Sequence, residues 1–417
     1  MKTLAIIAEY NPFHNGHLYH LNTAKEISGA SHSITLMSGN FLQRGVPAMW
    51  DKYTRGHMST VCGIDLALEL PFPYATGSAK DFASGAVNIL DKLNTIDYLC
   101  FGAENDDIVL LTKIADLINE ETPLYKKLLT EALSSGLSFP EARAKAVYNS
   151  LDNKDKELSS IINQPNNILA IEYIAALLRI NSRIKPVIIK RKESMYHDKK
   201  LHSSISSATA IRNSVVASPT NIEQLKTQLP LEVYELICSS FGVSWPVLPE
   251  MLTPFLQAQL LNPINFSEIC DISEDFANKL YNINPATNYQ DIAEHLTSKD
   301  LTASRVYRNL IHLILQYRES DRNLFLQNGY AMYANIISFR RESSALIKQI
   351  NEQTSIPLIT KKADFDKYLS NYPALNHSAA KAMWNYDTKA TTLYNALVYN
   401  SYNYKLPNDF NIQLPIV

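Results

Sequence analysis

Several features are scarce in this 417-residue sequence, and each scarcity excludes a class of protein. The only cysteines are Cys62, Cys100, Cys238 and Cys270, which form neither a Cys-x-x-Cys pair nor a zinc-type spacing with histidine. They are typical of reduced core thiols. No segment approaches about 18 uninterrupted apolar residues, and the first apolar run is too short for a secretory signal. We therefore expect a cytoplasmic protein with no membrane partner.

An excess of charge of either sign is also lacking. The chain has 39 lysines and arginines against 41 acidic residues, a formal net charge of −2. A protein that holds nucleic acid by bulk charge would be strongly basic, so an RNA partner needs a local basic surface. We expect no DNA partner. A typical size of about 150 residues per domain predicts two or three domains.

The first half alternates short β-type runs with helical patterns. Runs typical of strands lie at residues 4–8, 33–38, 65–71, 97–102 and 185–191. Continuous apolar strands separated by helices predict a parallel sheet covered on both faces, with right-handed crossovers. The expected fold class is therefore α/β and Rossmann-like, with ligands bound at the carboxyl ends of the strands.

Two regions depart from this alternation. Residues 106–183 are mostly helical by pattern and are expected to form an insertion before the last strand. After about Ser218 the clear β runs stop, and the periodicity predicts a mainly α-helical C-terminal domain. We therefore predict a division into residues 1–217 and 218–417, with no repeat or low-complexity tract.

The stretch AEYNPFHNGHLYH, residues 8–20, joins the first strand to the first helix. A helix start at the edge of the sheet presents unpaired N–H groups that favour phosphate. Gly16 lets the backbone approach a ligand, and Asn15 is a candidate cap. His14, at the end of the loop, and His17, on the first turn, can both donate hydrogen bonds and, when protonated, charge to one phosphorus. His20 lies a turn further on and is expected to pack or hydrogen-bond at the edge of the site.

A second anion motif is SSISSATAIR, residues 203–212. The hydroxyls of Ser206, Ser207 and Thr209 favour a helix start, whose first turn is expected to carry Arg212. Such a start suits the β and γ phosphates of a nucleotide. The alternative is an ordinary capping pattern. The fingerprints GxGxxG and GxxxxGK(S/T) are absent, so neither a dinucleotide fold nor a P-loop is indicated.

Both motifs resemble those of the HIGH-type nucleotidyltransferase superfamily, although Ala208 stands where a threonine is frequent. The stretches MSGNFLQRGVPAMWDKYTR, GIDLALELPFPYA, FGAEN and PNNILAIEYI narrow this resemblance. Together with the two anion motifs they are similar, over roughly residues 1–215, to the tRNA(Met) cytidine acetate ligase family. The C-terminal half is similar only in general layout.

The resemblance implies a Rossmann-like nucleotidyltransferase domain that forms acetyl-adenylate from acetate and ATP. The acetyl group then passes to N4 of the wobble cytidine in elongator methionine tRNA. Mg²⁺ is expected mainly on the ATP phosphates, because no carboxylate cluster marks a protein-built metal site. The ATP site implied by the family comprises Ile7, Ala8, Glu9, Tyr10, Asn11, Pro12, Phe13, His14, Asn15, Gly16, His17, Leu18, Tyr19 and His20, with Gly102, Asn166, Asn167 and Arg191.

Each of the later residues in that set also has a plainer interpretation. Gly102 either leaves room for adenine or ribose or is a turn glycine. Asn166 and Asn167 either bind ATP or cap the following helix, and Arg191 is either a ligand contact or a solvated charge. Lys52 and Arg55 either hold acetate or triphosphate or lie on an exposed helix face.

An RNA surface is predicted where basic residues gather. Between Arg179 and Arg212 nine basic residues stand against two acidic ones, next to the second anion motif. The residues predicted to bind tRNA are Lys190, Lys192, Lys199, Lys200, Arg305 and Arg308. Arg340 and Arg341 in the helical half are weaker candidates. Solvated helix faces explain the four arginines of that half equally well.

Two other functions use the same motifs. One is an adenylyltransferase that acts on a mononucleotide, phosphopantetheine or another carboxylate, and the other is a non-catalytic RNA-binding protein with bound ATP. The helical second half and the basic segment favour a macromolecular acceptor over a small one. The intact pair His14 and His17 argues against a non-catalytic role.

Overall fold

The computed structural model describes residues 2–151, 161–191, 206–218, 221–262 and 264–417. Within these residues, the centre is a seven-stranded sheet in the order β5-β4-β1-β2-β3-β6-β7. Its first five strands in this order run parallel. They are β1 (Thr3–Ala8), β2 (His32–Ser38), β3 (Leu66–Leu70), β4 (Tyr98–Ala103) and β5 (Lys185–Lys190). The five strands predicted from the sequence are thus all present, and the predicted parallel α/β sheet is confirmed.

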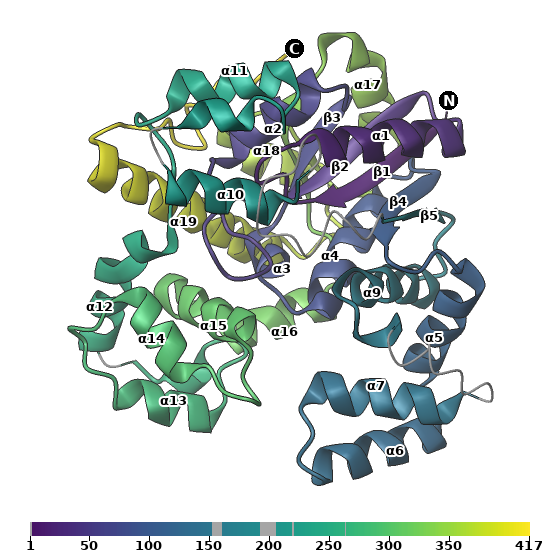
Figure 1. Ribbon diagram of the computed structural model, residues 1–417. Helices are drawn as coiled ribbons and strands as arrows, with labels where there is room; N and C mark the ends of the chain where they lie inside the picture. The colour runs from purple at the N-terminus through teal and green to yellow at the C-terminus, as the bar shows by residue number, and fades with distance from the viewer. Residues whose placement is uncertain (1, 152–160, 192–205, 219–220, 263) are drawn as a thin grey trace.

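Helices cover both faces of this sheet (Figure 1). Successive residues of a strand point to opposite sides. Leu4 and Ile6 of β1 therefore pack in one cluster with Leu21 of α1, while Ala5 lies in the cluster of Ala83 of α4. The helices that follow the first three strands are α1 (Asn15–Ser28), α2 (Lys52–Val61), α3 (Phe72–Ala75) and α4 (Ala79–Lys92).

The predicted helical insertion lies between β4 and β5. Its described helices are α5 (Ile108–Glu120), α6 (Pro123–Ser134), α7 (Phe139–Ser150) and α9 (Pro165–Arg179). Pro123 and Pro165 stand at first helical positions, where a missing N–H donor costs nothing. Helix α9 packs on α4 and α5, whereas α6 and α7 pack on each other away from the sheet (Figure 1). The predicted insertion is confirmed.

The second half is mainly helical, as predicted. Helix α10 (Ala208–Ala217) ends the predicted first domain. The helices described after it are α11 (Leu231–Ser240), α12 (Thr253–Leu261), α13 (Glu274–Tyr281), α14 (Tyr289–Leu296), α15 (Ala303–Leu315), α16 (Glu319–Gln327), α17 (Ser344–Gln353), α18 (Phe365–Ser370) and α19 (His377–Tyr402). Helices α12 to α15 gather into a lobe at the lower left of Figure 1. We call these four helices and their connections the helical lobe.

The expectation that strands end after Ser218 is wrong. Strand β6 (Ala334–Phe339) pairs antiparallel with β3, and β7 (Leu358–Ile359) pairs with β6. Five of the six residues of β6 are buried, so the run lacks the alternation of a half-exposed strand. A short apolar run of this kind cannot be told from a buried helical segment by periodicity alone.

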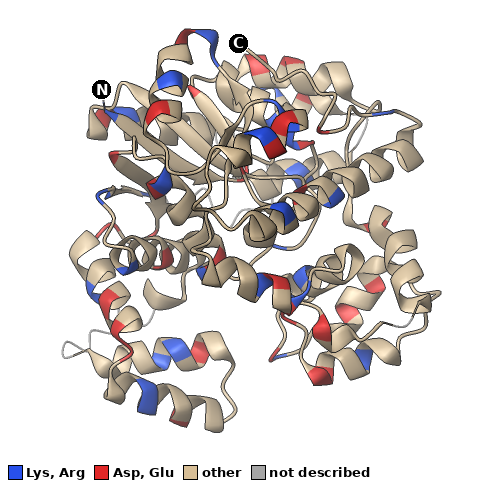
Figure 2. Cartoon of the chain, turned by 180° about the vertical axis from the view of Figure 1, so that it is seen from behind, with Lys and Arg blue, Asp and Glu red and all other residues tan. Residues whose placement is uncertain are grey.

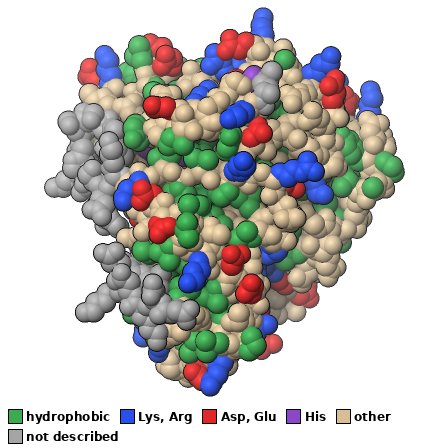
Figure 3. Space-filling model, turned by 90° about the vertical axis from the view of Figure 1, so that its right-hand side faces the viewer, with side chains coloured by type: hydrophobic (Ala, Val, Ile, Leu, Met, Phe, Trp, Pro, Cys, Tyr) green, Lys and Arg blue, Asp and Glu red, His purple; other side chains and the backbone are tan. Residues whose placement is uncertain are grey.

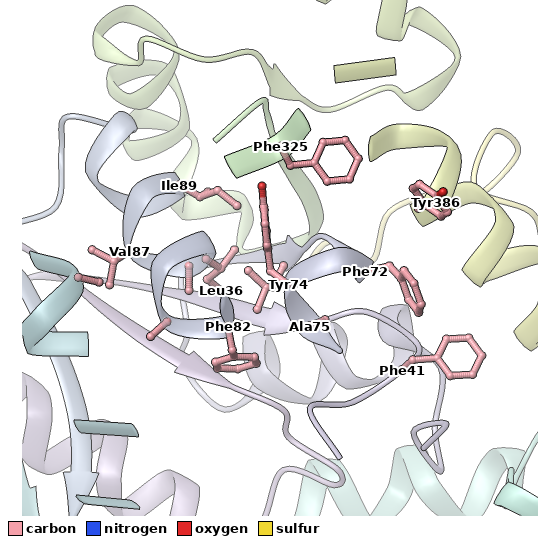
Figure 4. Packing of buried hydrophobic residues seen from close by; sticks show 14 of the residues in the cluster. Leu36, Phe41, Phe72, Tyr74, Ala75, Phe82, Val87, Ile89, Phe325 and Tyr386 are labelled. Carbon is pink, nitrogen blue, oxygen red and sulfur yellow. The ribbon is translucent and has the colours of Figure 1, made fainter. Parts of the chain in front are cut away.

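The hydrophobic core also crosses the predicted boundary at 217/218. Figure 4 shows Leu36 of β2 and Phe72 and Tyr74 of α3 close to Phe325 of α16 and Tyr386 of α19. All five side chains belong to one buried cluster. The boundary therefore separates neither two sheets nor two cores.

Charged side chains are spread over the whole fold. Figure 2 shows lysines and arginines interspersed with acidic residues on most elements, in keeping with the nearly balanced composition. Among the described residues, no helix is both long enough and apolar enough to span a membrane.

Candidate active site

The loop from β1 into α1 places His14 directly before the helix. His14 has extended backbone angles, φ −135° and ψ 173°, and is the N-cap of α1. Its Nδ1 accepts a hydrogen bond from the Gly16 N–H at 3.0 Å, while its own N–H donates to Nδ1 of His17 at 3.3 Å. His17 lies in the first turn, as predicted. The prediction of Asn15 as the cap is wrong: the His14 ring takes that role, and the Asn15 amide donates to the Thr227 carbonyl.

The rings of His14 and His17 lie side by side, with centroids 3.8 Å apart and planes inclined by 31°. Each Nδ1 accepts a backbone N–H, so the proton of each neutral ring is on Nε2. The loop geometry therefore fixes the tautomer of both rings. Each neutral ring therefore has one N–H donor, on Nε2.

Positive charge at the site comes from arginine rather than imidazolium. Burial, followed by repulsion from Arg191 and Arg212, lowers the pKa of His14 from 6.5 to about 3. Burial and the neighbouring His14 lower the pKa of His17 well below its ordinary value. Both rings are therefore neutral near pH 7 in the protein without ligand. Hydrogen-bond donation is the part of the predicted role that this geometry supports.

The second anion motif lies beside the first. Ser207 is the N-cap of α10, and its Oγ accepts from the Ala210 N–H at 3.1 Å. Arg212 is the fifth residue of α10 rather than part of its first turn. Its guanidinium donates to the Asn11 carbonyl oxygen at 2.8 Å and to Thr209 Oγ1 at 3.2 Å. The Arg212–Asn11 hydrogen bond therefore joins the two anion motifs.

Gly102 of β4, Asn166 at the start of α9 and Arg191, which follows β5, lie together. A Cβ on Gly102 would lie 3.2 Å from Cγ of Arg191, so the glycine makes room for the arginine stem. Arg191 Nη1 donates to Asn166 Oδ1 at 3.3 Å. The Glu104 carboxylate accepts from the backbone N–H of Asn166 at 3.3 Å and of Asn167 at 2.8 Å. Glu104, which the sequence reasoning missed, thus has the capping role left open for the two asparagines.

Many of the other predicted ATP-site residues support the shape of the loop. Tyr10 and Phe13 lie in a buried cluster, and Asn11 Oδ1 accepts from the Met49 N–H at 2.9 Å. Burial, followed by repulsion from Arg191, lowers the pKa of His20 to about 4. Residues fully buried or packed on the cores are Ile7, Ala8, Leu18, Ser206 and Asn167, whereas Tyr19 is exposed.

Lys52 and Arg55 do not lie on an exposed helix face, so that interpretation of them is wrong. Neither side chain reaches solvent. Lys52 Nζ lies 2.8 Å from Glu69 Oε1 and 3.1 Å from Asp409 Oδ2. Arg55 donates to the carbonyl oxygens of Glu9 at 2.6 Å and Ser38 at 3.1 Å. Arg55 therefore ties together the chain segments that leave β1 and β2.

The predicted RNA-binding residues differ in their surroundings. Lys190 pairs with Asp106 at 3.0 Å, and Arg305 pairs with Asp271 at 2.9 Å. Lys192, Lys199 and Lys200 lie outside the described residues. On the face that Figure 3 shows, lysines and arginines are scattered among hydrophobic and acidic side chains.

Among the residues that the structure describes, no group of three or more His, Cys, Asp or Glu side chains could hold a metal ion. Near the histidine pair, Glu9 Oε1 already accepts from the Gln43 N–H at 2.9 Å, and Glu104 caps α9. The described side chains therefore fit a metal carried by the phosphates better than a protein-built cage.

A parallel sheet with an HxGH helix start and a serine-capped helix at its carboxyl edge defines a HIGH-type nucleotidyltransferase. The family model described as "HIGH Nucleotidyl Transferase" matches residues 1–409. The tRNA(Met) cytidine acetate ligase of Thermoanaerobacter sp. (strain X514) is 39% identical over 403 residues, covering 96% of each chain. That of Clostridium perfringens (strain ATCC 13124) is 37% identical over 404 residues, covering 95% of this chain and 96% of the relative.

Solved structures agree with these relatives. The crystal structure of Thermotoga maritima TmcAL without ligand is 31% identical and matches all of both chains with a TM-score of 0.94. The structure of the same protein bound to alpha-thio ATP is 30% identical and matches with a TM-score of 0.91, again over all of both chains. This chain belongs to the tRNA(Met) cytidine acetate ligase family, which confirms the resemblance stated from its motifs.

Proposed function

We propose that this protein activates acetate with ATP and transfers the acetyl group to N4 of the wobble cytidine of elongator tRNA(Met), giving N4-acetylcytidine. The observation that carries the proposal is the convergence of His14, His17, Arg191 and Arg212 at one edge of the sheet. Family membership supports the choice of acetate and tRNA. The ATP analogue bound to the Thermotoga maritima protein supports ATP as the nucleotide.

In the first step an acetate oxygen attacks the α-phosphorus of ATP, and the bond to the leaving pyrophosphate breaks. The products are acetyl-adenylate and pyrophosphate. Negative charge builds on the α-phosphate oxygens, and we assign its stabilisation to the Nε2–H donors of His14 and His17. These donors are held in place by backbone hydrogen bonds, so little reorganisation is needed during the reaction. Arg191 and Arg212 supply the positive charge.

The remaining ATP contacts are assigned by the same reasoning. We propose that the loop of residues 7–20, Gly102, Asn166 and Arg191 surround the nucleotide, with Ser207, Thr209 and Arg212 at its outer phosphates. Ser206 and Asn167 are buried and are assigned to support of this site. Mg²⁺, held mainly by the phosphates, would neutralise charge on the leaving pyrophosphate.

In the second step N4 of the cytidine attacks the carbonyl carbon of acetyl-adenylate. The bond from that carbon to the phosphate oxygen breaks, AMP leaves, and N4 gives up a proton. We assign RNA binding to the part of the chain after residue 217, together with Lys190 and the basic residues 192, 199 and 200 of the sequence. Because tRNA is the substrate, we propose that the protein works in the cytoplasm.

The test is exchange of labelled pyrophosphate into ATP. Exchange that requires acetate supports the proposal, and exchange that requires a mononucleotide or phosphopantetheine instead would assign a small-molecule adenylyltransferase. No exchange with any acid would assign a non-catalytic ATP-bound protein. Incubation with ATP, acetate and elongator tRNA(Met) should then add one acetyl group to the anticodon fragment, as measured by mass spectrometry.

A further inference from the structure

A cavity of about 430 Å³ lies between the sheet edge and the helical lobe. Its walls come from the turn between α3 and α4, from residues 267–273 and from α15 and α16. The charged side chains in its lining are three arginines and three carboxylates: Arg305, Arg308, Arg322, Asp81, Asp271 and Glu319. Equal numbers mean that the cavity as a whole is not basic, so its chemistry depends on which charges are already paired.

Two of the arginines, Arg305 and Arg322, form ion pairs with all three carboxylates. Arg305 donates to Asp271 at 2.9 Å. Arg322 donates to both carboxylate oxygens of Asp81 at 3.0 Å and to Glu319 at 2.9 Å. The acidic groups of the lining are therefore neutralised by close ion pairs.

Arg308 is different, because it has no hydrogen bond or ion pair with any residue that the structure describes. Its Nε is buried, while the side chain as a whole is partly exposed. Arginine has five N–H donors, and buried donors without a partner are rare in folded proteins. His312 one turn along adds no charge, because burial lowers its pKa to about 4. Arg308 is thus the cation of this cavity that remains available to a ligand.

A second arginine without a hydrogen bond or ion pair among the described residues, Arg44, belongs to a segment that contacts the backbone of α15 at Arg308. The segment 39–48 leaves the carboxyl end of β2, and Gly45 in it lies so close to α15 that a Cβ there would overlap the Arg308 backbone nitrogen. The adjacent Arg44 is exposed and has no hydrogen bond or ion pair with the described part of the chain. After burial, repulsion from Arg44 lowers the pKa of Arg212. The segment 39–48 therefore contacts α15 at Arg308, and its Arg44 lies close enough to Arg212 to affect the pKa of that residue.

We propose that Arg308 and Arg44 bind phosphodiester groups of the RNA and lead its backbone from the helical lobe to the acetylation site. This inference rests on the proposed function. Guanidinium groups match phosphate oxygens in geometry, and contacts of this kind position RNA without reading its bases. The two arginines would therefore contribute to the affinity for any tRNA, with the choice of anticodon made elsewhere.

The experiment measures the affinity for elongator tRNA(Met) over a range of salt concentrations. Replacing Arg308→Gln or Arg44→Gln should weaken binding and reduce the slope of log K against log salt by about 0.7–0.9 each. Arg318→Gln is the matched control, because Arg318 lies at the edge of the same lobe but pairs with Glu268 at 3.2 Å. It removes the same charge and should leave the slope and the acetate-dependent exchange unchanged.

Further variants keep the result interpretable. Arg308→Lys retains the charge and should retain the wild-type slope, and thermal unfolding checks that each variant folds. A wild-type slope in both Arg308→Gln and Arg44→Gln would overturn the inference. A wild-type protein without tRNA binding or acetate-dependent exchange would overturn the proposed function as well. The last measurement is a titration with inorganic phosphate. If Arg308→Gln loses phosphate binding but keeps the wild-type slope of log K for tRNA against log salt, the site binds a free anion and not RNA.

Discussion

Arg212 donates a hydrogen bond across 2.8 Å to the carbonyl oxygen of Asn11, a residue 201 positions earlier in the chain. This bond joins the start of α10 to the loop that precedes α1, and so joins the two anion motifs. Because the guanidinium is already fixed on one side by the backbone, its remaining N–H groups have a defined direction. Arg212, which we assign to the phosphates, therefore also stabilises the loop that carries the histidine pair.

Replacing Arg212→Lys should weaken ATP binding by about tenfold, because a single ammonium cannot serve the Asn11 carbonyl and a phosphate as a fork does. Equilibrium ATP binding, measured by calorimetry, checks this. The control is Arg183→Lys, the same exchange at an exposed position before β5. Equal affinities in the two variants would contradict the double role of Arg212.

Replacing His17→Ala should slow acetate-dependent pyrophosphate exchange by about 10²–10³-fold, because one donor to the transition state is lost. The dissociation constant of ATP should change much less, since the donor is assigned mainly to charge that develops during the reaction. His57→Ala, on α2 and outside the site, is the control. If His17→Ala retained normal turnover, the assignment of this ring to catalysis would be wrong.

The pH profile should distinguish neutral imidazole from imidazolium. The pKa of His14 falls from 6.5 to about 3 in the folded protein, so its neutral form is the one that folding favours. The contribution of this pKa shift to the free energy of unfolding is fully present above pH 6.5, and it is lost as the pH falls toward 3. We therefore expect kcat/KM for ATP to have no histidine-dependent change from about pH 6 to about pH 8. A fall in activity as the pH rises through 6.5 would show that a protonated ring is needed.

Replacing Lys52→Met should lower the free energy of unfolding by about 3–5 kcal/mol, because Glu69 and Asp409 would lose a buried counter-ion. Denaturant unfolding measures the change. Lys348→Met removes an exposed ion pair with Glu352 and should change the stability by less than about 1 kcal/mol. Similar values for both variants would mean that the buried network adds no more than a surface pair.

Comparing Gly45→Ala with Gly29→Ala should separate the cost of backbone strain from the cost of a steric clash with α15. Gly45 and Gly29 both have positive φ, +77° and +62°, so alanine at either position costs about 1–2 kcal/mol. A Cβ at Gly29 meets nothing within 4 Å, whereas one at Gly45 overlaps the backbone of α15. Gly45→Ala should therefore destabilise the protein more than Gly29→Ala and weaken tRNA binding. Equal destabilisation would show that the segment can move off α15 without cost.

The sequence by itself determined the five parallel strands, the helical insertion and the identity of the family. Continuous apolar runs of strand length and long local motifs are properties of short segments, and they can be read without knowing what packs against them. The pairing of His14 and His17 at one helix start was equally local. The identity of the helix cap was not local. The Asn15 side chain donates a hydrogen bond to the distant Thr227 carbonyl oxygen, so His14 is the cap.

Only the tertiary structure decided which charged side chains are buried, which are paired and which are available to a ligand. Lys52 and Arg55 have the sequence of an exposed helix face, yet α2 is covered by Asp409 and by the segments that leave β1 and β2. Arg305 and Arg308 are equivalent in sequence, but an acidic partner 34 positions earlier binds one of them, and the other faces a cavity unpaired. Whether a charge is buried, paired or available depends on residues far away in the chain, and a local pattern holds no information about them.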